Sequence, residues 1–466
     1  MSDPTRELLI VLTVAAVLAL AGAVLALAGA VLAIAGHRTR RSPLTATGCA
    51  LLFAGGATVL GWAIVDGAGA EAAGVGLVAA LVPAPFLVAT FLWLGRHRRR
   101  PWLVLAFCFG WGACVATAVA LGVNTGVAYL LRENGLNENL AAVVSAPVIE
   151  EIAKLAGPLL ILWLARGHFT GMLDAIVYCG LAGAGFAVAE NVLYASGAYV
   201  SGTQILDESA GIALVTQLVL LRGLATMFAH PLMTGLSAVG LGKAVRRPGR
   251  KGAQTAWIVG MLLCGMGLHA LWNGSSLLGT AIDLPGLWFA LYPAFLMPLF
   301  FTMVGLALWL RAADARRTQT ALAPYVASGL LSPPELASLA SFSRRSSARA
   351  WARRIAGPGG ERAMKDFQRA AADVTEQIDL ASIGGRYDEH RIGTGLYRMG
   401  EARAAYTGRD PRMPAATWDG SRYHVTFPDG KVRTVEPPAP PVMPLPLPSF
   451  QPPPPPGPPT YPVSYA

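Results

Sequence analysis

The sequence predicts an all-α membrane protein, a polytopic bundle of about nine transmembrane helices followed by a partly helical, partly disordered C-terminal tail. Three observations predict this class. Of the 466 residues, 54% are hydrophobic and only 14% are charged, whereas soluble globular domains carry about 25% charged residues. Apolar segments of about 20 residues, the length that crosses the hydrocarbon core of a bilayer, recur along the chain. Short basic runs separate these segments, which is typical of proteins oriented in a membrane.

The apolar segments give nine candidate spans. They are residues 8–35, 44–65, 73–94, 102–122, 141–165, 171–195, 211–241, 255–279 and 287–310. The apolar run from Leu8 to Ala35 is far longer than the roughly 7–15 residues of a signal-peptide core, so we expect this helix to be retained. The five cysteines lie in apolar runs without CxxC pairing, and we interpret them as small core residues.

The charges of the predicted loops fall into two alternating sets. One set is basic: Arg38, Arg40 and Arg41; Arg96 and Arg98 to Arg100; Arg166; Lys243, Arg246, Arg247, Arg250 and Lys251; Arg311, Arg316 and Arg317. The other set is mostly acidic: Asp66 and Glu71; Arg132, Glu133 and Glu138; Asp207 and Glu208; Asp283. The positive-inside rule makes the basic side cytoplasmic, which predicts an extracytoplasmic N-terminus and a cytoplasmic C-terminus. The net charge of +10 therefore reflects orientation in a cell membrane and indicates no nucleic-acid partner.

The chain after Leu310 is polar and basic. A Ser-Pro-Pro start at 332–334 and a Gly-Pro-Gly-Gly break at 357–360 predict two helices between residues 332 and 377. Residues 418–435 alternate around a Pro-Asp-Gly turn and predict a hairpin. The proline-rich end predicts polyproline II disorder that either binds a partner or is inert. The expected regions are 1–72 (two N-terminal helices), 73–310 (main bundle), 311–417 (basic helical extension), 418–436 (small hairpin) and 437–466 (Pro-rich tail).

Charged side chains inside the predicted spans need an explanation, because each costs about 2.5–3.5 kcal/mol to insert. Glu150 and Lys154 share a helix face at i and i+4 and could neutralise each other. Glu151 points about 100° away from Glu150, so we expect only one of the two to pair with Lys154 and the other to find a metal, a proton or another partner. Two histidines on separate spans, His230 and His269, strengthen a functional interpretation.

Other polar residues in the spans have a structural and a functional interpretation. Asn191 and Asn273 can orient neighbouring groups or join helices by hydrogen bonds. Arg222 can balance a carboxylate, hold a substrate oxygen or extend to the membrane surface. Asp174 lies at a helix N-terminus, where an acid is favoured, and we interpret it as structural. We expect Gly180, Gly183 and Gly185 to permit close helix packing.

The polar residues form an ordered set of short motifs on successive spans. The set is Glu150-Glu151-x-x-Lys154, Phe186-x-x-x-Glu190-Asn191, His230 and His269-x-x-x-Asn273. It resembles the PrsW family of intramembrane proteases, which is related to the type II CAAX prenyl endopeptidases, over residues 141–280. The CAAX relatives have a histidine in place of Glu190, so prenyl-protein chemistry is not implied. The resemblance implies cleavage of membrane-anchored proteins within the lipid bilayer, such as anti-sigma factors.

Two hydrolytic mechanisms fit these residues. In the first, Zn²⁺ is held by Glu190, His230 and His269, and Glu150 or Glu151 is the general base. In the second, no metal is bound, a glutamate is the base, and His269 with Asn273 holds the oxyanion. We expect the remaining members of the set to support the site or bind substrate: Lys154, Phe186, Asn191 and Arg222.

The site should form one cluster inside the bundle, because lipid rejects polar groups. We expect Glu151, Glu190, His230 and His269 to converge within about 10 Å, between the membrane centre and its outer face. Two functions other than proteolysis remain open at this point. One is a proton-coupled transporter that uses the buried Glu and His residues, although no repeat or matched pair of broken helices is evident. The other is a membrane interaction scaffold.

Overall fold

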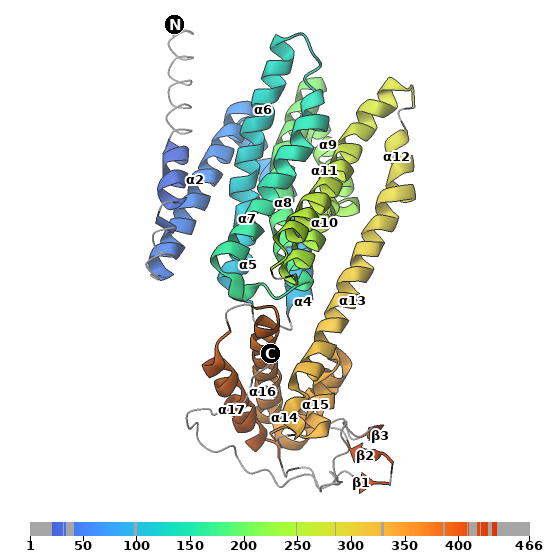
Figure 1. The fold of residues 1–466 in the computed structure, drawn as a ribbon. Helices are drawn as coiled ribbons and strands as arrows, with labels where there is room; N and C mark the ends of the chain where they lie inside the picture. The colour runs from blue at the N-terminus through green and yellow to red at the C-terminus, as the bar shows by residue number, and fades with distance from the viewer. Residues whose placement is uncertain are drawn as a thin grey trace. The chain divides into compact units, whose positions relative to one another are not determined.

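The fold was obtained as a computed structural model, and apart from a small three-stranded sheet its described elements are helical (Figure 1). The structure describes residues 21–30, 32–33, 42–96, 100–247, 249–284, 286–327, 330–384, 387–407, 409, 417–419, 421–426 and 431–435. The chain forms two compact units, residues 1–95 with 100–305 and residues 96–99 with 306–466. The predicted all-α polytopic class is confirmed.

Seven helices of the described residues are long and apolar enough to cross a membrane. They are Pro43–Ala68, Ala70–Gly95, Trp102–Glu133, Met172–Ile205, Glu208–Val245, Lys251–Ser275 and Leu287–Val326. The expected span 141–165 is also helical, but Glu150, Glu151 and Lys154 place it outside this apolar set. Most of the expected first span lies outside the described residues, so the count of nine stays a prediction.

The spans are built from α-helices, several of which are interrupted by short π-helical or 3₁₀ turns (η). In chain order they are α2 (Ser42–Ala68), α3 (Ala70–Leu81), α4 (Ala84–Gly95), α5 (Trp102–Gly110), η1 (Trp111–Ala116), α6 (Thr117–Glu133), η2 (Ala141–Ser145), α7 (Ala146–Leu164), η3 (Arg166–His168), α8 (Met172–Ile205), α9 (Glu208–Leu218), η4 (Val219–Ala225), α10 (Ala229–Val245), α11 (Lys251–Ala281), α12 (Leu287–Leu291), η5 (Tyr292–Leu296) and α13 (Met297–Leu322). Interruptions of this kind are frequent at functional sites.

Helix α8 is the central helix of the membrane unit. In its most apolar stretch 83% of the residues are buried, against 39% or less in each of the other six spans. Glycine makes this burial possible, since a Cβ on Gly183 would lie 3.1 Å from the Cα of Pro231. Small residues let helix backbones approach closely. The backbone of α10 therefore packs against α8 immediately beside His230.

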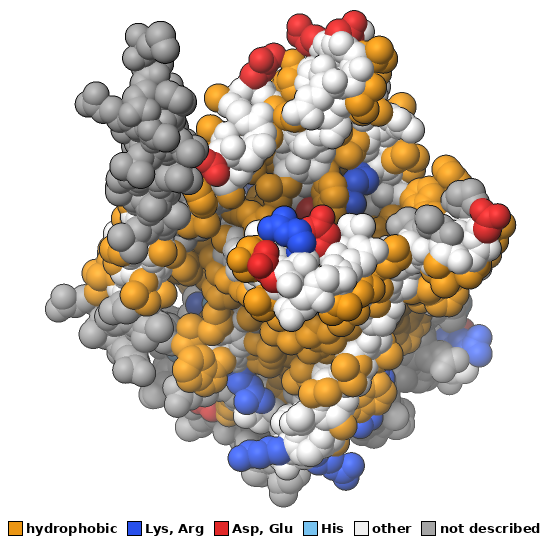
Figure 2. Space-filling model, turned by 90° about the horizontal axis from the view of Figure 1, so that it is seen from above, with side chains coloured by type: hydrophobic (Ala, Val, Ile, Leu, Met, Phe, Trp, Pro, Cys, Tyr) orange, Lys and Arg blue, Asp and Glu red, His pale blue; other side chains and the backbone are white. Residues whose placement is uncertain are grey.

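The two ends of the membrane unit differ in charge. Figure 2 looks onto the end that carries the α6–α7 connection, and acidic side chains lie at the tips of its helices. Glu133 and Glu138 are exposed there. This division agrees with the alternating loop charges of the sequence, and the assignment of this end to the extracytoplasmic side remains a prediction.

At the opposite end, Asp174 joins three segments of the membrane unit. One carboxylate oxygen accepts hydrogen bonds from Arg100 Nε at 2.9 Å and Nη2 at 2.5 Å. The other accepts from the backbone N–H and hydroxyl of Thr170 at 2.8 and 2.6 Å. Arg246 Nη2 donates to the Thr170 carbonyl at 3.4 Å. The structural role expected for Asp174 therefore has a specific basis, because it holds the start of α8 to the neighbouring loops.

We expect Asp174→Asn to lower the free energy of unfolding by about 3–5 kcal/mol, since removing one partner leaves a buried charge uncompensated. Both side chains of the Arg100–Asp174 pair are only 5% exposed. Thermal unfolding in detergent measures the loss. Arg132→Gln is the control, because its pair with Glu138 is 63% and 55% exposed and should contribute about 0–1 kcal/mol. Equal stability of the two variants would contradict the structural role of Asp174.

The second unit has its own helical core. Its helices are α14 (Pro324–Ala327), α15 (Pro333–Leu339), α16 (Phe342–Ser382) and α17 (Glu389–Ala404). Ser332 caps α15 in a capping box with Glu335, at the predicted helix start. Gly357, with φ at +64°, sits at the kink that divides α16 at the predicted break, because a positive φ favours glycine. Trp351 and Phe367 are buried between these helices.

Three short antiparallel strands follow the helices of this unit. They are β1 (Thr417–Trp418), β2 (Tyr423–Thr426) and β3 (Val432–Val435), in the order β1-β2-β3. Tyr423 pairs with Val435 and Thr426 with Val432, which is the hairpin expected from the alternating residues. The predicted Pro-Asp-Gly turn and the proline-rich tail lie outside the described residues. The strand β1 was not predicted, because two residues are too few to show an alternating pattern.

Candidate active site

Two adjacent carboxylates and a lysine lie on the buried face of α7. Lys154 Nζ lies 3.2 Å from Glu150 Oε2 and 2.9 Å from Glu151 Oε1. Glu151 and Lys154 are fully buried, and Glu150 is 5% exposed. The expectation that only one glutamate would pair with Lys154 is wrong, because the long lysine side chain lies between the i−3 and i−4 positions and reaches both. The Lys154 ammonium also lies 4.0 Å from the centre of the Phe186 ring.

The two glutamates differ in their other contacts. Both oxygens of Glu151 are occupied: Oε1 lies 3.0 Å from His269 Nδ1, and Oε2 accepts a hydrogen bond from Thr234 Oγ1 at 3.0 Å. Glu150 Oε2 lies 3.8 Å from His269 Nε2. Glu151 is thus enclosed by partners, whereas Glu150 faces the second nitrogen of the same histidine.

His230 lies between the lysine and a third carboxylate. Its Nδ1 lies 3.0 Å from Lys154 Nζ, and its Nε2 lies 2.5 Å from Glu190 Oε2. An ammonium group only donates hydrogen bonds, so Nδ1 accepts, and Nε2 carries the proton and donates to Glu190. The chain breaks its helix at residues 226–228 and resumes at Ala229. This break places His230 in the first turn of α10, against α8.

Glu190 also forms an ion pair with η4. Arg222 Nη2 lies 2.6 Å from Glu190 Oε2, and its guanidinium carbon lies 4.0 Å from the centre of the Tyr194 ring. Arg222 Nε donates to Asn191 Oδ1 at 3.5 Å. Arg222 therefore pairs directly with a carboxylate, which is one of the roles expected for it, and Asn191 helps to orient the guanidinium.

Asn273 and Phe186 lie at the border of the cluster. Asn273 Nδ2 donates to the carbonyl oxygen of Ala142 at 2.9 Å, which joins α11 to the π-helical turn before α7. The Phe186 ring centre lies 5.3 Å from that of His230. The His230 and His269 ring centres are themselves 5.4 Å apart. Helices α7, α8, α10 and α11 thus bring Glu151, Glu190, His230 and His269 into one continuous network.

Sequence reasoning missed two residues of this network. Thr234 lies one turn after His230 on α10 and bonds Glu151, so its i+4 spacing was a usable signal. Asn124 Nδ2 donates to Glu150 Oε1 at 3.4 Å, and its Oδ1 accepts from Ser145 Oγ at 2.8 Å. The predicted span ended at residue 122, whereas α6 continues to Glu133. Asn124 was consequently assigned to a loop.

A cavity of about 470 Å³ leads to the cluster. Glu150, Glu190 and Asn273 lie on its wall, and Glu138 and Asn139 of the α6–α7 connection line its other part. Glu151 is not among the lining residues. Glu150 and Glu190 are therefore the two carboxylates of the cluster that substrate and water can reach through this cavity.

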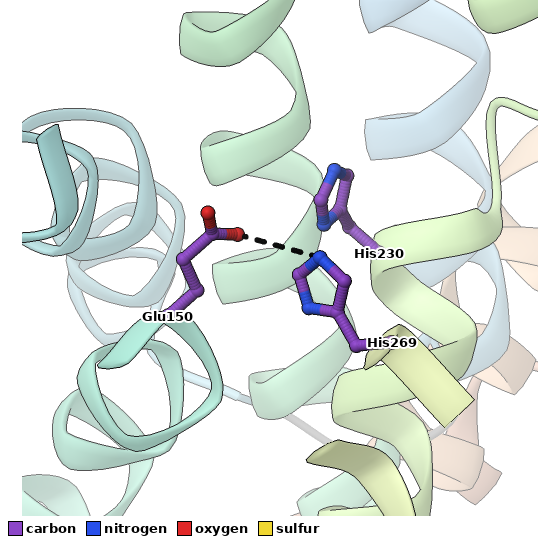
Figure 3. A group of neighbouring side chains, drawn as sticks. All are labelled: Glu150, His230 and His269. Atoms are coloured by element: carbon purple, nitrogen blue, oxygen red, sulfur yellow. Dashed lines mark ion pairs between the residues drawn. The ribbon is translucent and has the colours of Figure 1, made fainter. Parts of the chain in front are cut away.

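Three side chains of the cluster lie close enough together to hold a metal ion. A potential ligand atom from each of Glu150, His230 and His269 lies within 4.8 Å of the others (Figure 3). Two imidazoles and a carboxylate suit zinc. The contact between Glu151 and His269 Nδ1 resembles the carboxylate that usually orients a metal-binding histidine. The sequence had assigned Glu190 to this set, and the structure instead pairs Glu190 with Arg222, so that assignment stays a prediction.

The geometry agrees with the comparison with known protein families. Residues 100–304 match the family model described as PrsW family intramembrane metalloprotease. No curated protein and no solved structure matches the chain. The match covers all ten candidate site residues named from the sequence, and together with the apolar helices it makes this a multi-pass membrane protein. Over residues 100–304 this chain is therefore similar to the PrsW family of intramembrane metalloproteases.

Proposed function

We propose that this chain is an intramembrane endopeptidase that hydrolyses membrane-anchored proteins, with anti-sigma-factor-like regulators as the substrate class that the family resemblance suggests. The observation that carries the proposal is the cavity, on whose wall two carboxylates, Glu150 and Glu190, lie beside two buried histidines. Hydrolysis of a peptide bond requires a positioned water, a general base and a group that stabilises the oxyanion. The cluster offers a candidate for each role.

The donor set fits a metal ion, and Glu150, His230 and His269 are the residues that would hold it. The resident ion would be Zn²⁺, which lowers the pKa of a bound water and polarises a carbonyl. Glu151 supports this assignment, because its contact with Nδ1 of His269 directs Nε2 of that ring towards Glu150. Such carboxylates fix the tautomer and the orientation of a ligating ring.

Glu190 is the general base in this proposal. It lies on the cavity wall, and its partners Arg222 and His230 hold its carboxylate in place. Glu190 accepts a proton from the attacking water and later returns it to the leaving amine. Arg222 balances the negative charge that develops on the substrate oxyanion beside Glu190. Asn273, also on the cavity wall, positions the substrate carbonyl. Sequence reasoning gave the role of base to Glu150 or Glu151, and the enclosure of Glu151 favours the change.

A metal-free mechanism is favoured by one observation, the position of Lys154. Its ammonium lies within 3.2 Å of Glu150, Glu151 and His230, so positive charge is already present among these groups. Glu150 would then be the base that faces the cavity, and His269 with Asn273 would hold the oxyanion. Metal dependence separates the two mechanisms.

The proposed function is tested with the purified full chain in lipid vesicles that contain a library of single-span peptides. We expect mass spectrometry to detect cut peptides, chelation to stop the cleavage, and added Zn²⁺ to restore it. His230→Ala and His269→Ala should lose both cleavage and zinc. Cleavage that persists after complete removal of metal would establish the metal-free mechanism. An absence of cut products with every peptide would contradict the protease proposal.

A further inference from the structure

One face of α6 forms a long wall of the cavity. Its lining residues recur every three or four positions: Thr117, Ala120, Leu121, Asn124, Thr125 and Ala128. At 1.5 Å per residue, the distance from Thr117 to Ala128 is about 16 Å. An extended peptide rises about 3.3 Å per residue, so this wall matches roughly five residues of extended chain.

The chemistry of the wall suits an unwound segment of a membrane anchor. A peptide that leaves its helical form exposes backbone N–H and C=O groups, each of which costs several kcal/mol in lipid without a partner. Polar side chains line the cavity, including Asn124 and Thr125 on α6 and Asn139, Tyr194 and Asn273 from other segments. Such groups can replace the lost helical hydrogen bonds.

The size of the wall residues limits the substrate side chains. None of the six α6 residues is larger than leucine, and the cavity volume of about 470 Å³ lies in the lower part of the 300–1,000 Å³ range of ligand pockets. Spread over five residues, this volume leaves little room for bulky side chains. Ala120 is 2% exposed and packs with Phe186, so this part of the wall is also held rigidly.

We propose, on the basis of the proposed protease function, that the α6 face is the substrate-binding wall. It selects an extended stretch of small residues at the end of the anchor that lies beside the α6–α7 connection. The sequence predicts that this end is extracytoplasmic. The selected segment lies along this wall, between Asn139 and the carboxylates of Glu150 and Glu190 that also line the cavity.

Photo-crosslinking tests the wall without turnover. A benzophenone amino acid is placed at residue 128, or at residue 123 as control, in the Glu190→Gln full chain. Val123 is on the same helix, is 39% exposed and does not line the cavity. Two single-span peptides in phosphatidylcholine vesicles serve as probes, identical except for an Ala-Ser-Ala-Ser-Ala or a five-Phe segment at one end. We expect position 128 to capture the Ala-Ser peptide at least about tenfold more than position 123 captures it, and at least about tenfold more than position 128 captures the five-Phe peptide. Equal capture from positions 123 and 128, or of both peptides, would overturn the proposal.

Cleavage provides the second measurement, with Ala128→Trp compared with Val123→Trp in the otherwise unchanged chain. Ala128→Trp fills the cavity beside the wall and should slow cleavage of the Ala-Ser peptide by at least about tenfold. Val123→Trp lies outside the cavity and should change the cleavage rate by no more than about twofold. Zinc content and thermal unfolding verify that both variants are folded. Cleavage by Ala128→Trp at the rate of the unchanged chain would refute the wall while leaving the protease function intact. Failure of the unchanged chain to cut any peptide would refute the function itself.

Discussion

Replacing Glu190 with glutamine is expected to lower kcat for peptide hydrolysis by about 10²–10⁴-fold, the usual contribution of a positioned general base, without loss of bound metal. Glutamine keeps the shape of the side chain, and its carbonyl oxygen can still accept from Arg222 and from His230, the present partners of Glu190. It cannot take a proton from water at neutral pH. The variant should therefore fold, bind metal and fail in the chemical step.

Glu150→Gln is the matched comparison, because both carboxylates lie on the same cavity wall. Glu150 belongs to the group whose potential ligand atoms lie within 4.8 Å of one another, so its loss should remove metal and activity together. Metal analysis and single-turnover cleavage of an identified substrate are measured on both variants. The opposite pattern, with metal lost from Glu190→Gln and retained by Glu150→Gln, would restore the ligand set that the sequence suggested.

The membrane environment explains why so much of this fold could be predicted from the sequence. Lipid forces backbone groups into helices, and it forces charged groups away from the bilayer. Glu190 and His230 are 40 positions apart in the chain, yet they meet at 2.5 Å. This contact could be expected, because polar residues on separate spans face the interior of the bundle and pair with each other or with another polar group.

The choice of partner within the cluster could not be predicted in the same way. It depends on the rotation of each helix, and the interruptions at η1, η2 and η4 change that rotation. The break before Ala229 sets the direction of His230, and no residue pattern marked it. Lys154 bonds two carboxylates of its own helix and a histidine of α10, which requires the relative positions of two helices to be known.

Helix lengths were the other source of error. The hydropathy pattern ends the fourth predicted span at residue 122, but the helix continues for three more turns to Glu133. Those turns contain Asn124, which contacts Glu150, and three of the six α6 residues that line the cavity: Asn124, Thr125 and Ala128. Polar residues that face a cavity make a transmembrane helix appear to stop early.

Glu151→Gln is expected to weaken zinc affinity by about 10–100-fold, the usual effect of removing the carboxylate that orients a ligating histidine. Glu151 is fully buried and contacts His269 Nδ1 and Lys154 Nζ through the same oxygen. With glutamine, the His269 ring loses a charged acceptor and Lys154 loses one of its two carboxylates. The ring is then less firmly directed towards Glu150, and the ammonium charge beside the ligands is less well compensated.

Competition with a fluorescent chelator measures the affinity, and cleavage is followed as zinc is raised to saturation. Thr234→Val is the matched control, because it removes only the hydroxyl that donates to the other oxygen of Glu151 at 3.0 Å. It should reduce affinity by less than Glu151→Gln does. If Glu151 orients His269, saturating zinc restores most of the cleavage by Glu151→Gln, since Glu150, Glu190 and both histidines remain in place. Cleavage that stays abolished with the site fully loaded would instead make Glu151 the base, reached by water through a rearrangement of the enclosed pair.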